Sequence, residues 1–168
     1  MTKWIMTIGV AVLLASALGC EENHRTTATT TNVTIGGKVY TLDLALDQNA
    51  RVKGLSGRES IPEAGGMVFV FPDSEVSRHE FVMRDCPNPI DIIFLDRSRR
   101  VTATHTMLPE PPRKEGEDIA AYENRLKRYS SRFDAQYAIE LKGGSLAKTP
   151  VKAGELVNVD PSLATLAK

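Results

Sequence analysis

The hydrophobic pattern of this chain is centred on two short runs with apolar residues on both faces. Residues 66–71 read Gly-Met-Val-Phe-Val-Phe, and residues 90–95 read Ile-Asp-Ile-Ile-Phe-Leu. A strand with one exposed face alternates apolar and polar residues, whereas a run that is apolar on both faces is typical of the centre of a covered sheet. A turn, Pro87-Asn88-Pro89, separates the runs. We therefore expect the core and the main pocket of the fold here.

Alternating segments flank these runs and predict strands with one buried face. Residues 33–46 are typical of a hairpin around the turn Gly36-Gly37. Alternation recurs at 78–84, 100–107, 136–142 and 155–159. In the segment 136–142, the inward face is predicted to consist of Tyr137, Ile139 and Leu141. Eight short strands without strand–helix alternation predict a mainly β fold, a small β-sandwich or a partly open barrel.

Two helices are predicted between the strands. Asp47 is a good N-cap for a short helix after the first hairpin, from Gln48 to Lys53, which Gly54 ends. The second helix, residues 117–129, has acids at its start and bases at its end, as the helix dipole favours. Its apolar stripe at helical spacing consists of Ile119, Tyr122, Leu126 and Tyr129. Because the stripe is narrow, we expect one inserted surface helix at about residues 115–129.

The N-terminus has the pattern of an export signal. Lys3 precedes an apolar stretch at residues 5–18, which is short for a membrane span. The stretch ends in Ser-Ala-Leu-Gly-Cys, which resembles a bacterial lipobox with Cys20 as the lipid attachment site. This predicts export and lipid anchoring to a bacterial membrane, on the periplasmic or cell-surface side. Ordinary cleavage that leaves a free Cys20 and an uncleaved anchor are the alternatives.

The domain organisation follows from this interpretation. We expect a signal peptide at residues 1–19, a flexible tether at 20–31, a single β domain at 32–160 and a tail at 161–168. The tether has no apolar side chain larger than alanine. If a lipid occupies the sulfur of Cys20, Cys86 has no cysteine partner, and the core alone must hold the domain.

Charge and motifs exclude several classes of function. The 21 basic and 21 acidic residues balance, so no bulk field attracts nucleic acid. Three or four convergent ligands would be needed for zinc, and His79 and His105 have no ligand pair at a useful spacing. No P-loop, GxGxxG, HExxH, CxxC or GxSxG pattern occurs. We therefore expect no nucleic acid, no metal and no cofactor, and the sequence names no reaction.

Three ordered motifs resemble the DUF192 family of uncharacterised bacterial and archaeal domains. They lie at residues 54–58 (Gly-Leu-Ser-Gly-Arg), at 66–71 and at 81–94 (Phe-Val-Met-Arg-Asp-Cys-Pro-Asn-Pro-Ile-Asp-Ile-Ile-Phe). The resemblance implies a small mainly β domain, often secreted or lipid-anchored, without an established reaction. The chain departs from the family pattern at four positions, where the family has Trp, Lys, Asn and Thr: Val82, Arg84, Asp85 and Cys86.

Asp91 is the most unusual residue of the central strands. A carboxylate on the apolar face of Ile93 and Leu95 must be paired or hydrogen-bonded to be tolerated. Arg58 and Arg84 are the candidate partners, and we expect Arg58 and Asp91 to form one polar unit beneath the 87–89 turn. The candidate ligand-binding residues are Arg58, His79, Met83, Asp85 and Asp91. The structural alternative is a buried ion pair or turn cap that holds the turn.

Three functions are compatible with this pattern. The first is a non-catalytic binding module for a small molecule, a glycan or a protein, without catalytic residues. The second is a hydrolase-type enzyme that uses Asp85 or Asp91 with His79 as an acid–base pair. The third is a structural or assembly factor without a pocket. Convergence of the candidate side chains on an open cleft would favour the first two, and the sequence gives no oligomeric state.

Overall fold

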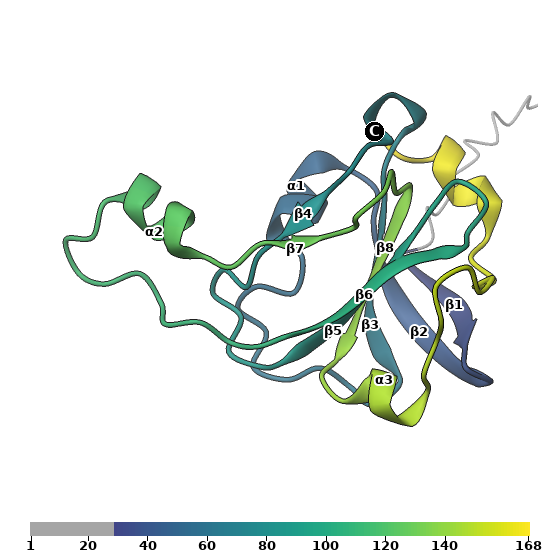
Figure 1. Cartoon of the computed structure of the whole chain (residues 1–168), viewed down its shortest axis with the longest axis horizontal. Helices are drawn as coiled ribbons and strands as arrows, with labels where there is room; N and C mark the ends of the chain where they lie inside the picture. Colours follow the sequence, from purple (N-terminus) through teal and green to yellow (C-terminus); the bar gives the residue numbers. More distant parts are fainter. Residues whose placement is uncertain (1–28) are drawn as a thin grey trace, which may run out of the picture.

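A computed structural model describes residues 29–168 and consists mainly of β-structure (Figure 1). Six strands form one sheet in the order β1-β2-β3-β8-β5-β6. Their bounds are Thr30–Ile35 (β1), Lys38–Ala45 (β2), Gly65–Val70 (β3), Ile90–Leu95 (β5), Val101–Met107 (β6) and Tyr137–Lys142 (β8). Glu80–Phe81 (β4) and Tyr129–Ser130 (β7) form a second, two-stranded sheet. The fold is an open β-sandwich, as predicted, and these residues form no closed barrel.

The six-stranded sheet is antiparallel except at one place. β2 and β3 run parallel, with Thr41 beside Gly65. The connection between them contains helix α1 (Gln48–Lys53), which follows the hairpin as predicted. Gly66 in β3 permits a close approach to β8, because a Cβ at this position would lie 2.1 Å from the carbonyl oxygen of Glu140. The parallel connection thus lays α1 over the sheet, next to the centre of β8.

Both faces of the central strands are covered. Every residue of β3 and β5 is buried, which confirms the interpretation of the two apolar runs. One apolar cluster contains Met67, Phe69, Ile92 and Phe94, and the other contains Val68, Val70, Ile93 and Leu95. Helix α1 and the β4–β7 ribbon lie on the face of the first cluster (Figure 1). The C-terminal segment adds Val157, Val159 and Leu163 to the second cluster.

The predicted strand boundaries are wrong at three places. Only Glu80 and Phe81 of the segment 78–84 are in a strand. Residues 155–159 make isolated bridges, such as Arg100 to Leu156, instead of a closing strand. β7 was not predicted, because its first residue, Tyr129, was assigned to the end of the second helix. After these bridges, a 3-10 helix, η2 (Pro161–Thr165), buries Leu163 against the sheet.

The inserted helix is shorter than predicted and projects from the body of the domain (Figure 1). α2 comprises Ile119–Arg125, and Asp118 caps it by accepting hydrogen bonds from two backbone amides. Ile119 is 65% exposed, whereas Tyr122 and Leu126 are buried. Tyr129, the last residue of the predicted stripe, belongs to the first apolar cluster of the domain.

Two shorter helices complete the described chain, η1 (Asp73–Glu75) and α3 (Ser145–Lys148). Among residues 29–168, no helix has the length and apolar character that crossing a membrane requires. The predicted signal peptide, most of the tether and Cys20 lie outside the described residues.

Candidate functional site

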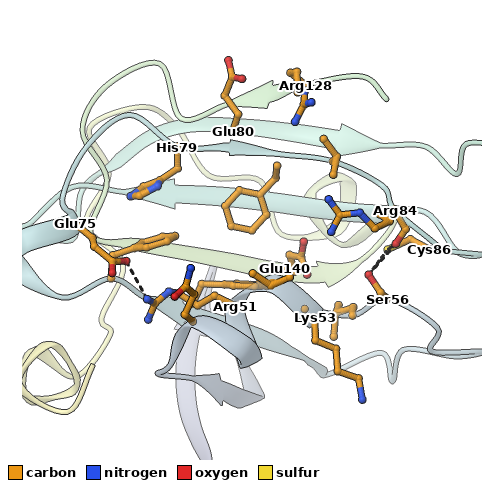
Figure 2. A pocket seen from close by; sticks show the side chains of 18 residues that line it. Arg51, Lys53, Ser56, Glu75, His79, Glu80, Arg84, Cys86, Arg128 and Glu140 are labelled. Carbon is orange, nitrogen blue, oxygen red and sulfur yellow. Dashed lines mark hydrogen bonds and ion pairs between the residues drawn. The ribbon is translucent and has the colours of Figure 1, made fainter. Parts of the chain in front are cut away.

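A pocket of about 330 Å³ lies between helix α1 and the face of the sheet that carries the first apolar cluster. Residues from α1, β3, β4 and β8 line it. Figure 2 shows Glu140 among the labelled side chains, with His79 and Arg84 on either side. The volume lies at the lower end of the range typical of small-molecule sites. The lining of this pocket combines aromatic side chains with charged ones, among them Arg84, Arg128 and Glu140.

The short sequence of α1 creates one wall of the pocket. The side chain of Asp47 accepts a hydrogen bond of 2.9 Å from the amide of Ala50 and begins the helix. Gly54 ends it with a φ of 50°, in the left-handed region that favours glycine. A Cβ at Gly54 would lie 3.2 Å from Phe69 and 3.6 Å from Oε2 of Glu140. The absence of a side chain here leaves room directly beside the Glu140 carboxyl.

Glu140 supplies the buried acid of the pocket. It lies in β8 between Met67 of β3 and Ile92 of β5, and it is 5% exposed. Its Oε2 atom is buried without a hydrogen-bond partner. Burial raises the pKa of this carboxyl to about 8, while the Leu55 backbone amide and the charge of Arg58 act in the opposite direction. Glu140 is therefore mainly protonated at neutral pH.

His79 supplies a second polar group. Its ring stacks on that of Phe71, with 3.6 Å between the centroids and 12° between the planes. Its Nε2 atom is buried and has no hydrogen-bond partner. Burial lowers the pKa of His79 below its ordinary value, with a smaller opposite effect of nearby carbonyl groups. The imidazole is therefore neutral at pH 7.

Aromatic rings form the apolar interior. The rings of Phe69 and Phe81 meet edge to face at 5.0 Å, and Phe81 meets Phe94 in the same way at 5.3 Å. Such pairs are favourable because the positive edge of one ring faces the negative face of the other. Phe69 and Phe81 also line the pocket. The interior thus offers aromatic surface next to a single carboxyl.

Basic side chains line the wall and the mouth of the pocket. Arg51, whose side chain is buried, is held in the wall by the carbonyl oxygens of Leu46 and Val70 and by an ion pair of 2.9 Å with Glu75. Arg84 makes two hydrogen bonds of 2.6 Å to the two carboxylate oxygens of Glu123. Two carboxylates thus neutralise these two guanidinium groups.

The remaining basic groups of the mouth have no such partner. Arg128 donates to the backbone carbonyl oxygen of Glu123. Within residues 29–168, neither Arg128 nor Lys53 belongs to an ion pair. The mouth therefore carries positive charge that other side chains do not neutralise.

Cys86 lies in the wall as an unreactive thiol. It is buried, and burial raises its pKa to about 11. Its Sγ donates to the carbonyl oxygen of Arg84, and Ser56 donates to the same oxygen. Because the thiolate is the nucleophilic form, a pKa this high leaves the group inert at neutral pH.

No metal site accompanies the pocket in the described part of the chain. Over residues 29–168, no group of three or more His, Cys, Asp and Glu side chains is arranged to hold a metal ion. His79 and Glu140 both line the pocket, and each has a buried polar atom without a hydrogen-bond partner.

Comparison with known proteins identifies the family. Residues 31–159 match the profile of DUF192, described as an uncharacterised ACR. The chain belongs to the DUF192 family. Curated proteins include no match to it. The match covers the whole described domain except its first and last segments, in agreement with the resemblance of the three motifs.

Two solved structures share the fold of this DUF192 domain. A protein of unknown function from Novosphingobium aromaticivorans is 24% identical, with a TM-score of 0.64 over 81% of this chain and 90% of that chain. A candidate transcription regulator from Sinorhizobium meliloti is 21% identical, with a TM-score of 0.59 over 76% of this chain and 89% of that chain. At these identities the similarity establishes the fold alone.

The predicted pair of Arg58 and Asp91 is wrong. Arg58 makes an ion pair of 2.7 Å with Asp43. Asp91 is fully buried and accepts hydrogen bonds from the Thr106 hydroxyl at 2.7 Å and the Leu146 amide at 2.8 Å. It does lie on the face of Ile93 and Leu95, but that face is opposite to the pocket. Asp91 therefore fastens α3 and β6 to β5. Its role is structural, but it forms neither the ion pair nor the cap of the 87–89 turn that the structural alternative named.

The other predicted residues are distributed around the first cluster. Met83 is buried within this cluster. Asp85 lies in the following turn with a φ of 51°, and its carboxylate accepts a hydrogen bond from the Tyr122 hydroxyl. Of the five predicted ligand-binding residues of this DUF192 domain, His79 is the one that lines the pocket.

The sequence analysis missed Glu140. Alternation in the segment 136–142 assigned Tyr137, Ile139 and Leu141 to the interior, so Glu140 was expected to face solvent. All three are buried, but the opposite face of β8 is covered as well, and Ala138 and Glu140 are buried there. The sequence holds one indication that this second face is also buried, because Ala138 on the presumed outer face is apolar.

Proposed function

We propose that this DUF192 protein is a non-catalytic small-molecule binding module, held by an N-terminal lipid on the outer side of a bacterial cytoplasmic membrane or on an outer membrane. The binding site is the pocket between α1 and the sheet. Its ligand donates a hydrogen bond to Glu140 and contacts the rings of Phe69 and Phe81. Arg84 and Arg128 orient the part of the ligand that reaches the mouth.

One observation carries the proposal. Within residues 29–168, two buried side-chain polar atoms lack a hydrogen-bond partner, and both line this pocket. Leaving a buried polar atom unpaired costs about 1–3 kcal/mol. Folded proteins rarely retain such groups without a function. A ligand that pairs with Glu140 Oε2 and His79 Nε2 recovers this energy.

The shape of the pocket favours a small molecule over a glycan or a protein. Small-molecule sites are concave and largely apolar, with a few polar groups in fixed positions. The interior here has aromatic walls, one carboxyl and one imidazole, in about 330 Å³. A protein or a long glycan would instead bind across an extended surface.

The lipid anchor is supported by the N-terminal pattern. An apolar stretch that ends in small residues and Cys20 precedes the domain. Cys20 and the stretch lie outside the described residues. Eleven residues separate Cys20 from residue 32, where the predicted domain begins. A coil of that length would span about 18 Å, which would keep the pocket near the membrane surface.

The geometry does not favour a hydrolase that pairs Asp85 or Asp91 with His79. Asp91 is engaged with Thr106 and Leu146 on the opposite face of the sheet. Asp85 contacts Tyr122 of the projecting helix and does not line the pocket. The acid that does share the pocket with His79 is Glu140.

A thermal-shift screen of the full-length chain in detergent tests the proposal. A ligand at 100 times its Kd stabilises the folded state by about 2.7 kcal/mol. For a domain of this size, such a gain raises Tm by about 5–10 °C. Hits that stabilise the wild type should fail on Glu140→Gln and persist on Glu59→Gln, which removes an exposed carboxylate outside the pocket. Hits that act equally on both variants would refute the assigned site.

A further inference from the structure

The charges around the pocket are arranged in two zones. The interior holds one carboxyl, Glu140, and no basic side chain pairs with it. The exposed rim is lined by three basic residues, Lys53, Arg84 and Arg128, and by one acid, Glu80, whereas Arg51, whose side chain is 7% exposed, pairs with Glu75 in the wall. An acid in the interior and an excess of bases at the mouth call for a ligand with the opposite arrangement of charge.

We infer that the ligand is a small zwitterion, whose amino group binds Glu140 in the interior and whose acidic group binds Arg84 and Arg128 at the mouth. This inference rests on the proposed function and specifies its ligand. A molecule of the size of an amino acid fits the volume of the pocket.

The interior is suited to an ammonium group. A buried carboxyl ionises readily only when a positive charge comes to lie beside it. Because Gly54 has no side chain, none crowds Glu140 Oε2 and the ring of Phe69 from this side. An ammonium group of a ligand that lies in the pocket next to these two groups meets the carboxylate and an aromatic ring, and both attract cations. A neutral amide would gain a weaker hydrogen bond from the same position.

The mouth is suited to a carboxylate or a phosphate. Arg84 and Arg128 come together at Glu123, which carries one negative charge against their two positive charges. Arg128 is exposed and donates one hydrogen bond, to a backbone oxygen, so its guanidinium has donors left for an anion. A planar guanidinium with free donors is well matched to a carboxylate.

A ligand with only one charged group would match only one of the two zones. An amine without an acidic group must pass a basic mouth to reach Glu140. An acid without an amino group binds the mouth but leaves Glu140 unpaired in the interior. A zwitterion satisfies both zones, because each of its charges meets a group of opposite charge.

Two sets of probes separate these cases by calorimetry on the full-length chain in detergent. In the first set, the zwitterion is 4-(aminomethyl)benzoate, whose two charges are far apart, and the singly charged probes are benzylamine and benzoate. In the second set, the zwitterion is phenylalanine, whose two charges are adjacent, and the singly charged probes are phenethylamine and 3-phenylpropanoate. In at least one set, we expect the zwitterion to bind at least about tenfold more tightly than either singly charged probe. A factor of about ten in Kd is what one additional charged hydrogen bond contributes.

Variants assign the two ends of the ligand. Arg128→Gln should weaken the zwitterion about tenfold and leave the amine unchanged. Lys127→Gln is the matched control, because Lys127 is the neighbouring exposed base and does not line the pocket. Glu140→Gln, which keeps the shape of the side chain, should weaken both the zwitterion and the amine.

The outcomes distinguish this inference from the proposed function. Equal binding of amine and zwitterion in both sets, or tighter binding of the anion, would overturn the zwitterion while the pocket remains a ligand site. If none of the six probes binds but the thermal-shift screen finds uncharged ligands, the zwitterion is again overturned and the pocket remains a ligand site. Failure of the probes together with no hit that depends on Glu140 would overturn both proposals.

Discussion

The carboxyl of Glu140 lies in the middle of a sheet that is covered on both faces, and no cation pairs with it. Such a group is tolerated mainly because it can remain protonated, as its pKa of about 8 reflects. Any charge that it acquires must be balanced by something that enters the pocket. This single residue therefore links the stability of the domain to its occupancy.

Stability should fall with pH because of Glu140. The folded protein holds this proton up to about pH 8, whereas the unfolded chain releases it near the ordinary glutamate pKa of 4.5. The folded state thus binds more protons between these values, so stability is full below pH 4.5 and declines up to about pH 8. At 1.36 kcal/mol for each pKa unit, the decline is about 5 kcal/mol.

Urea denaturation at pH 5, 6.5 and 8 measures this effect as the difference between wild type and Glu140→Gln. The variant has no proton to lose at this position. Its free energy of unfolding should therefore increase steadily relative to that of the wild type as pH rises. A difference that stays constant across these three values would show that Glu140 is ionised in the folded protein.

Asp91 should behave as a structural acid. In Asp91→Ala, the Thr106 hydroxyl and the Leu146 amide lose a charged acceptor, which should cost about 3 kcal/mol of stability. Asp43→Ala is the matched control, since Asp43 makes an exposed ion pair with Arg58 that is worth about 0–1 kcal/mol. Urea denaturation gives both values. A cost below 1 kcal/mol in Asp91→Ala, or loss of ligand binding, would contradict the structural role.

The sequence identified Asp91 and His79 but not Glu140, and the reason is physical. An acid within an apolar run is conspicuous, and Asp91 lies in such a run. In β8, Glu140 follows an alternating pattern that is equally typical of an exposed strand face. Only the position of β8 between β3 and β5, beneath α1, places that face inside. Arg58 could not be paired from sequence either, because its partner lies on another strand.

At the scale of elements, the segment from β6 to β7 is a separate arm. Its internal contacts are extensive: Arg125 binds Glu117 and the carbonyl oxygens of Pro111 and Pro112. Its links to the body include the Arg84–Glu123 ion pair and the contact of Tyr122 with Asp85. The arm therefore positions the basic mouth of the pocket but contributes little to the core of the sheet.

Removal of the arm should leave the domain folded. Replacing residues 110–127 with a short Gly-Ser linker removes the buried side chains of Tyr122 and Leu126, which we expect to cost a few kcal/mol from lost apolar burial. Circular dichroism and urea denaturation should still report a cooperative β domain. Global unfolding of this variant would show that the arm closes the core.

Tyr129→Ala tests where the arm ends. Tyr129 is buried within the first cluster, and removing a large aromatic side chain from a core costs about 3–5 kcal/mol. Ile119→Ser, at an exposed position of α2, should have little effect. A larger loss in Ile119→Ser than in Tyr129→Ala would contradict the assignment of Tyr129 to the core.

Elements with two apolar faces were the easiest to predict, because no other environment suits them. The central strands β3 and β5 and the capped helix α1 follow directly from the sequence. The segment 155–159 alternates like a strand, yet its backbone makes only isolated bridges. The second helix was predicted too long, since Leu126 and Tyr129 continue its spacing although they are buried for different reasons.

At the scale of the whole molecule, the proposed arrangement is a DUF192 domain attached to a membrane by a short tether. The domain has its own two apolar clusters and does not depend on a disulfide, since Cys86 is free. The pocket opens beside α1 and β4. A lipid at Cys20 would concentrate this binding site at the membrane surface.

Lipidation can be tested by replacing its attachment site. Expression of Cys20→Ala in a bacterium should leave the precursor unprocessed or release the protein from the membrane fraction. Mass spectrometry and membrane fractionation measure both effects, with Cys86→Ala as the control. Unchanged mass and fractionation of Cys20→Ala would exclude a lipid at this residue.

The most direct test of the ligand site is the titration of the Glu140 carboxyl by carbon-13 NMR, with the signal assigned by its absence in Glu140→Gln. In the free protein, we predict a midpoint at a pH of about 8. With a saturating amount of the strongest screened ligand, the same signal should shift and its midpoint should move. A midpoint near 4.5 in the free protein, or a signal that the bound ligand leaves unchanged, would contradict the account.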